Sequence, residues 1–153
     1  MRDEGRPLTS GEAALAASMF GGAIALDRVR VHRARWFAFQ PRDVVMAPDG
    51  HVWCHPDGST WREDFSAEGV GSQGLLIHEL THVWQAQHGG RWYLPLARHP
   101  FCRYAYEWVP GRPFARYGIE QQAEIVRHTF LLRQGVQVAG KPALADYEAM
   151  LPF

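Results

Sequence analysis

The chain has 153 residues, of which 46% are hydrophobic and 12% aromatic. This composition excludes an intrinsically disordered protein, and the length leads us to expect a single domain over residues 1–153. Sixteen basic residues balance sixteen acidic ones, so the formal net charge is zero. Proteins that bind nucleic acid usually carry a basic excess, and the balance of charge therefore argues against that class of partner.

The first seven residues carry several charges and lack the apolar stretch of a secretory signal peptide. No run of about 18 apolar residues occurs, so we expect no membrane-spanning segment and no membrane partner. Cys54 and Cys102 lack the CxxC spacing of a structural zinc site and are expected to be free thiols. These features predict a cytoplasmic protein, with export by a signal-independent secretion machine as the exception.

The first half of the chain mixes helix and strand signals. Thr9 and Glu12 have the spacing of a capping box, which predicts a helix over residues 13–20 that ends at a Gly-Gly pair. Residues 28–31 alternate arginine with valine, as in a strand. Residues 43–55 contain two β-rich runs around a Pro-Asp-Gly turn, which predicts a β-hairpin. An edge of this hairpin is a candidate for holding an extended peptide by β-addition.

The most informative segment is residues 78–82, which read HExxH. A helix is predicted around it, with Ser72 as the N-cap and a stop signal at residues 89–90. The apolar residues that recur with helical spacing are Leu76, Ile77, Leu80, Val83 and Trp84. They predict that one side of the helix packs into a core while the motif's polar residues face another side.

The motif itself predicts a metal site. His78 and His82 lie four residues apart on a helix, so both imidazoles project from one face and can share a metal ion. In zinc hydrolases with this pattern, zinc acidifies a water molecule and the glutamate, here Glu79, takes its proton. Catalytic zinc usually takes three protein ligands and leaves the fourth position to water, so a third ligand is required.

His88 is one candidate for the third ligand. It completes the spacing HExxHxxQxxH, which mimics the metzincin pattern, but that pattern has glycine where this chain has Gln85. On an unbroken helix His88 lies about 9 Å farther along the axis than His82. It then cannot reach the same ion, and a solvated histidine at the helix C-terminus is the favoured interpretation.

The second half begins with a proline-rich segment, residues 91–113, which we expect to be a long irregular loop that shapes a cleft. A helix is predicted over residues 119–133 and a short terminal helix over residues 142–151. Glu120 and Glu124 share one face of the first of these helices. Two like charges at this spacing are unfavourable, so a cationic group is expected opposite them.

This pair of glutamates resembles the gluzincin arrangement, in which a second helix carries an ExxxD motif. The first acid of that motif is the third zinc ligand, and the second orients a ligand histidine. The resemblance implies that Glu120 is the third ligand and that Glu124 has the orienting role. Glu124 is one methylene longer than the aspartate usual at that position.

Larger segments resemble a family of small bacterial zincin-like proteins described as Vgr-related, relatives of HExxH domains associated with secretion-system and injection-system proteins. The segments that carry the resemblance are residues 75–85, 99–104 and 117–128, together with residues 8–12, 29–32 and 46–50. The order of predicted elements is that of an α+β fold. The resemblance implies a minimal zincin-like domain, in which a small β-sheet or hairpin accompanies an active-site helix and a second ligand-bearing helix. It also implies secretion-system components as partners.

The predicted function is zinc-dependent hydrolysis of a peptide bond in a peptide or protein substrate. Zn2+ held by His78, His82 and Glu120 polarises the scissile carbonyl, and Glu79 passes a proton from water to the leaving amine. The predicted oxyanion donor is the hydroxyl group of Tyr117, one helical turn before Glu120. The alternative donors are Tyr104, Tyr106, His99 and His128.

Two other functions remain open from the sequence. One is a zinc-stabilised scaffold or assembly module of a bacterial secretion apparatus, with little catalytic activity. The intact Glu79 argues against it, because a purely structural zinc site needs no general base. The other is an amidase that acts on cell-wall peptide or another small amide, since the same metal chemistry serves both reactions.

Overall fold

A computed structural model of the chain describes residues 3–89 and 104–153 and shows an α+β fold, as predicted. The described part contains four α-helices, α1 (Ser10–Phe20), α2 (Val70–Gly89), α4 (Ile119–Arg133) and α5 (Leu144–Met150). It also contains three short strands, β1 (Arg6–Pro7), β2 (Arg30–His32) and β3 (Val52–Trp53). His99 and Cys102, together with most of the predicted loop over residues 91–113, lie outside the described residues.

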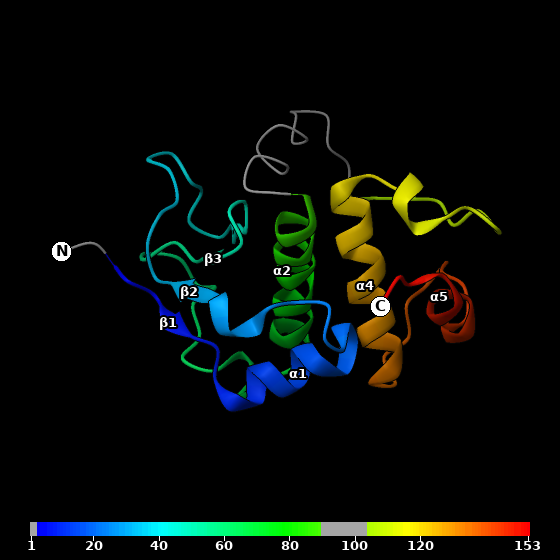
Figure 1. The fold of residues 1–153 in the computed structure, drawn as a ribbon, viewed down its shortest axis with the longest axis horizontal. Helices are drawn as coiled ribbons and strands as arrows, with labels where there is room; N and C mark the ends of the chain where they lie inside the picture. Colours follow the sequence, from blue (N-terminus) through cyan, green and yellow to red (C-terminus); the bar gives the residue numbers. More distant parts are fainter. Residues whose placement is uncertain (1–2, 90–103) are drawn as a thin grey trace.

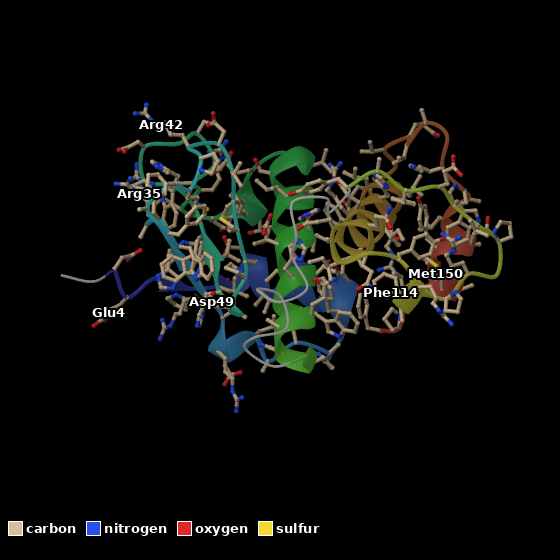
Figure 2. The ribbon with its side chains drawn as sticks, turned by 90° about the horizontal axis from the view of Figure 1, so that it is seen from above. Glu4, Arg35, Arg42, Asp49, Phe114 and Met150 are labelled. Atoms are coloured by element: carbon tan, nitrogen blue, oxygen red, sulfur yellow. The ribbon has the colours of Figure 1, made fainter. Side chains whose placement is uncertain are left out.

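Helices α2 and α4 lie side by side at the centre of the molecule, with the sheet on one side of α2 and α5 on the far side of α4 (Figure 1). The same order is visible from above in Figure 2. α2 has 20 residues and is therefore about 30 Å long. The apolar residues predicted to face a core are buried, apart from the half-buried Trp84. The central pair of helices is consequently rigid enough to hold side chains in fixed positions between them.

The helix boundaries lie within about three residues of the predicted ones. Thr9 and Glu12 form the predicted capping box at the start of α1, which ends at Gly21. Ser72 is not the N-cap of α2, because the helix begins two residues earlier, at Val70. A 3-10 turn leads directly into α2, and the side-chain amide of Gln73 donates to two backbone carbonyls of the preceding segment. These bonds tie the first turn of α2 to the segment before it.

The three strands form one mixed sheet in the order β1-β2-β3. β1 pairs with β2 in antiparallel orientation, and β2 pairs with β3 in parallel orientation, with Val31 opposite Val52. The hairpin predicted over residues 43–55 is therefore wrong as a regular pair of strands. Its two arms meet only at an antiparallel bridge between Met46 and Trp53.

A competing set of hydrogen bonds explains why the hairpin stops at one bridge. The side-chain amide of Gln40 donates to the carbonyl oxygens of Val44 and Trp53, and the amide of Val44 donates to the carbonyl of Pro41. These bonds form a turn before Met46. The arm that contains Met46 therefore runs as an irregular segment, which reaches the central helices.

Glu12 ties the N-terminal elements together. Its buried carboxylate accepts two hydrogen bonds from the guanidinium of Arg6, one from the backbone amide of Thr9 and one from that of Phe65. This carboxylate therefore joins β1, the start of α1 and the turn that leads into α2. A buried carboxylate is stable only when it is paired and hydrogen-bonded in this way.

Cys54 follows β3 and is a buried free thiol, as predicted. Burial raises its pKa to about 12. None of the helices in the described ranges is long and apolar enough to cross a membrane.

Candidate metal centre

Two histidines from α2 and one glutamate from α4 form a buried cluster. His78, His82 and Glu120 each offer one ligand atom, and these atoms all lie within 4.8 Å of one another. The Nε2 atoms of His78 and His82 lie 3.2 Å and 3.1 Å from the same carboxylate oxygen, Oε2 of Glu120. The sequence prediction for these three residues thus corresponds to one compact site between the two helices.

The local structure of both helices explains the convergence. The i, i+4 spacing in α2 places both imidazoles on the face that packs against α4. Glu120 lies in the first turn of α4, where the helix dipole favours a negative charge. The start of α4 is fixed by Gln121, whose side-chain oxygen accepts from the amide of Gly118. The acid is therefore held opposite the histidines by the way its helix begins.

The residues of this cluster fit a metal ion such as zinc. Two ligands of a tetrahedral zinc ion, each at about 2.0–2.1 Å, are about 3.3 Å apart, and the observed N–O separations are 3.1 and 3.2 Å. Two histidines and one glutamate are also a known ligand set of catalytic zinc. The three side chains are nearly inaccessible to solvent, so they need a cation between them to offset the cost of burying the carboxylate.

The pKa values in the cluster also favour a positive charge at this site. Burial alone lowers the pKa of His78, but the hydrogen bond to Glu120 and the attraction of the nearby Glu124 carboxylate outweigh burial and raise that pKa to about 10. Burial raises the pKa of Glu120, but its bonds to the two histidines dominate and hold that pKa well below its usual range. The site therefore stabilises a positive charge between the helices, which a proton or a metal ion can supply.

Glu124 lies on the other side of the His78 ring. Its Oε2 is 3.9 Å from Nδ1 of His78, which is an ion-pair distance and longer than a hydrogen bond. Arg127 donates to the same oxygen at 2.6 Å. Burial raises the pKa of Glu124, but His78 and Arg127 lower it to about 2, so the carboxylate is ionised. Glu124 therefore lies within ion-pair distance of the histidine that the gluzincin resemblance expects it to orient, and that role stays a prediction.

Gln85 holds the second histidine, and the sequence analysis did not foresee this. Its Oε1 accepts from Nδ1 of His82 at 2.8 Å, and its Nε2 donates to the carbonyl of Ile119 and to Oε1 of Gln122. Nδ1 of His82 therefore carries a proton, and Nε2, which faces Glu120, is the atom that can bind a metal ion. The i, i+3 spacing from His82 was the available signal, since such residues share a helix face.

Glu79 and Tyr104 line two cavities that adjoin the cluster. One, of about 220 Å³, is also bordered by His82 and Glu120, and the other, of about 260 Å³, by His78. The Tyr104 ring lies nearly parallel to the His78 ring, with 5.8 Å between centroids. Glu79 therefore sits next to the candidate ligands in a place that small molecules can enter.

The remaining candidates lie elsewhere. The hydroxyl oxygen of Tyr117 accepts from the backbone amide of Val109, and Tyr117 does not line either cavity beside the cluster. The hydroxyl of Tyr106 bonds to His128 and Tyr147. His88 is exposed and bonds the carbonyl oxygen of Trp84 through Nδ1, outside the cluster. Among the predicted oxyanion donors that the structure describes, only Tyr104 borders these cavities.

The geometry thus defines an α+β domain with a candidate metal centre built from an HExxH helix and a second helix. The solved structure of the effector domain of Pseudomonas aeruginosa VgrG2b is similar, with a TM-score of 0.78 and 38% sequence identity. The alignment covers 95% of this chain and 80% of that domain. The chain belongs to the family of this effector domain, which confirms the predicted Vgr-related resemblance.

The type VI secretion system spike protein VgrG2b of Pseudomonas aeruginosa is 41% identical in an alignment 137 residues long that covers 84% of this chain. The aligned region is 13% of the spike protein's length, so the similarity concerns one part of that protein. No protein-family model matches the chain.

Proposed function

We propose that the chain is a zinc-dependent metallopeptidase, a minimal gluzincin-like domain over residues 1–153. The observation that carries the proposal is the buried cluster of His78, His82 and Glu120 with Glu79 beside it at the wall of two cavities. A purely structural metal site would need no carboxylate beside its ligands in that position. The donor set favours zinc, because two histidines and a carboxylate leave one coordination position open.

In the proposed mechanism each residue of the chain has one task. Zinc, when bound by His78, His82 and Glu120, supplies Lewis acidity toward the scissile carbonyl and lowers the pKa of water to about 7. Glu79 accepts a proton from the attacking water and delivers it to the leaving amine, which balances the protons of the hydrolysis. The two helices keep these groups in place, so little reorganisation accompanies the reaction.

The orienting groups and the oxyanion donor complete the proposed site. Gln85 and Glu124 orient the rings of His82 and His78, respectively, each through the Nδ1 atom of the ring. The sequence favoured Tyr117 as the oxyanion donor, but Tyr117 borders neither of the two cavities at the cluster. We assign the donor role to Tyr104, which borders both cavities at the cluster.

The similarity to a secretion spike suggests where the activity is used. The related solved domain is described as an effector domain, and the related curated protein as a spike protein of a type VI secretion system. We propose that this chain is likewise an effector that leaves the cell with a secretion spike and acts on a peptide or protein. Components of that secretion apparatus are then its partners.

Four variants test the proposed function. The purified protein should bind one zinc ion per chain, and His78→Ala or His82→Ala should lose it. Glu79→Gln should keep zinc and thermal stability but lower the cleavage of a peptide library by about 10²–10⁴-fold. Glu107→Gln is the matched control, because Glu107 is exposed and distant in sequence from the motif. Near-normal cleavage by Glu79→Gln would contradict the mechanism.

One observation favours a second function. The cluster joins α2 to α4, so a metal ion there would also hold the two central helices together. A zinc-stabilised assembly module of a secretion apparatus would use the site in that way alone. Full zinc occupancy and strong stabilisation by zinc, combined with no cleavage of any library peptide, would favour this second function.

A further inference from the structure

The cavity of about 220 Å³ has an apolar lining next to the candidate metal centre. Glu79, His82 and Glu120 border it on the side of the cluster. The apolar residues that border it are Trp36, Val45, Met46, Ala47, Pro48 and Ile119. They come from the loop between β2 and β3 and from the start of α4, so the cavity is shaped by segments far apart in sequence.

The volume of this cavity is large enough for a bulky side chain. An engineered apolar cavity of about 150 Å³ binds benzene, and this cavity measures about 220 Å³. A phenyl ring or a branched aliphatic side chain therefore fits. A glycine or alanine side chain would leave most of the volume without partner atoms and would lose those contacts.

The second cavity beside the cluster has more ionisable residues in its lining. Asp43, Glu124 and Arg127 border it and do not border the first cavity. Glu79 and Tyr104 border both cavities, which therefore meet at the proposed catalytic base. A ligand that spans them meets the apolar residues of the first cavity on one side of Glu79 and these three ionisable residues on the other.

The segment of residues 43–48 passes both cavities and can hold an extended chain. Asp43 and Val44 border the charged cavity, Met46 and Pro48 border the apolar one, and Val45 borders both. Met46 pairs with Trp53 through its backbone, so in extended backbone Val45 directs its own amide and carbonyl the opposite way. Within the described ranges Val45 makes no backbone hydrogen bond, which leaves these groups available to a ligand.

We propose that the substrate is an extended peptide with a bulky apolar residue, of leucine or phenylalanine size, next to the scissile bond, and that the apolar cavity binds this side chain. The proposal rests on the proposed function and adds the class of substrate. Burying such a side chain instead of leaving it exposed changes affinity by about 10- to 100-fold. Discrimination against glycine at that position should have the same size.

Amino-acid hydroxamates test the proposal without any need for turnover. These compounds bind zinc through the hydroxamate group and present one side chain to the neighbouring surface. The zinc content of the protein is measured first, and the dissociation constants of glycine, alanine, leucine and phenylalanine hydroxamates are then measured by calorimetry. Leucine and phenylalanine hydroxamates should bind about 10- to 100-fold more tightly than the glycine compound.

Three variants locate the effect. Ala47→Trp fills the cavity, and Val45→Asp places a charge at its wall, so both should reduce the preference to less than about threefold. Val45 is only half-buried, which makes its variant tolerable if Ala47→Trp fails to fold. Phe39→Ala is the control, because Phe39 belongs to the same loop but is 87% exposed and does not border the cavity.

The outcomes separate this inference from the proposed function. A protein that binds no zinc contradicts the proposed metal centre, and the inference falls with it. A zinc-loaded protein that binds all four hydroxamates equally contradicts the apolar cavity alone and leaves the metal centre intact. A preference for leucine and phenylalanine that Val45→Asp removes and Phe39→Ala retains supports the inference.

Discussion

Replacing Gln85 with leucine removes the side chain that joins His82 to α4. Gln85 makes hydrogen bonds to His82, to the carbonyl of Ile119 and to Gln122, at 2.8, 3.0 and 2.9 Å. It is 3% exposed, so water cannot replace these bonds. At about 1 kcal/mol for each bond, the free energy of unfolding of the metal-free protein should fall by about 3 kcal/mol, since leucine preserves most of the volume.

The same substitution should weaken zinc binding. Without Gln85 the ring of His82 is free to turn and to carry its proton on either nitrogen, and losing such an orienting partner typically costs about 10- to 100-fold in metal affinity. Competition with a chelator measures the affinity of the folded protein, and urea unfolding in excess chelator measures the stability of the metal-free form. The two quantities are then obtained separately.

Gln87→Leu is the matched control for this experiment. Gln87 lies two residues farther along α2, is exposed, and bonds the backbone of Ala25 instead of a ligand. Its replacement should leave zinc affinity within about twofold. A similar affinity for Gln85→Leu and the unchanged protein would refute the orienting role, and an equal loss in both variants would mean that general destabilisation weakens the binding.

Three further predictions concern the ligands, pH and the N-terminal carboxylate. Glu120→Ala should weaken zinc binding by more than about 100-fold in chelator competition, whereas His88→Ala should leave it unchanged; the reverse order would make His88 the third ligand. The raised pKa of His78 means that its contribution to metal-free stability is complete below its ordinary pKa of 6.5 and is lost as pH rises through about 10. Urea unfolding in chelator should therefore show falling stability between about pH 6 and pH 10, and a flat profile would disprove that contribution. Glu12→Ala leaves the guanidinium of Arg6 without its partner, so the free energy of unfolding should fall by about 3–5 kcal/mol; a loss below about 1 kcal/mol would show that solvent stabilises that cation adequately.

The ligand cluster could be predicted because its signals are local. His78 and His82 share a face through the i, i+4 spacing of one helix, and Glu120 and Glu124 do so on another. Periodicity also fixes which sides of these helices are apolar and which strip of each helix carries the polar groups. The structure shows that the two polar strips meet between α2 and α4.

The parts that could not be predicted depend on tertiary contacts. The parallel pairing of β2 with β3 involves strands of three and two residues, which are too short for a pattern in the sequence to specify their partners. The bonds that Gln85 makes to Ile119 and Gln122 depend on how α2 and α4 are aligned along their axes, which the sequence does not specify. The direction of the Tyr117 hydroxyl is set by the path of the segment around Val109, for which no periodic rule exists.

Burial of Cys54 protects its thiol from oxidants in the surrounding solution. The thiolate is the reactive form of cysteine, and with a pKa of about 12 only about one thiol in ten thousand is ionised at pH 8. Its side chain is also completely inaccessible to solvent. Oxidants and thiol reagents can therefore reach it only when the surrounding structure opens.

The rate of that reaction then becomes a measure of opening. In a Cys102→Ser background, modification of Cys54 by a thiol reagent reports how often the region between β3 and α2 leaves the native state. Because the candidate metal centre lies on α2 and α4, added zinc should slow the modification if its binding is coupled to this region. The native thiol therefore reports the rate of local unfolding, and no cysteine has to be introduced for the measurement.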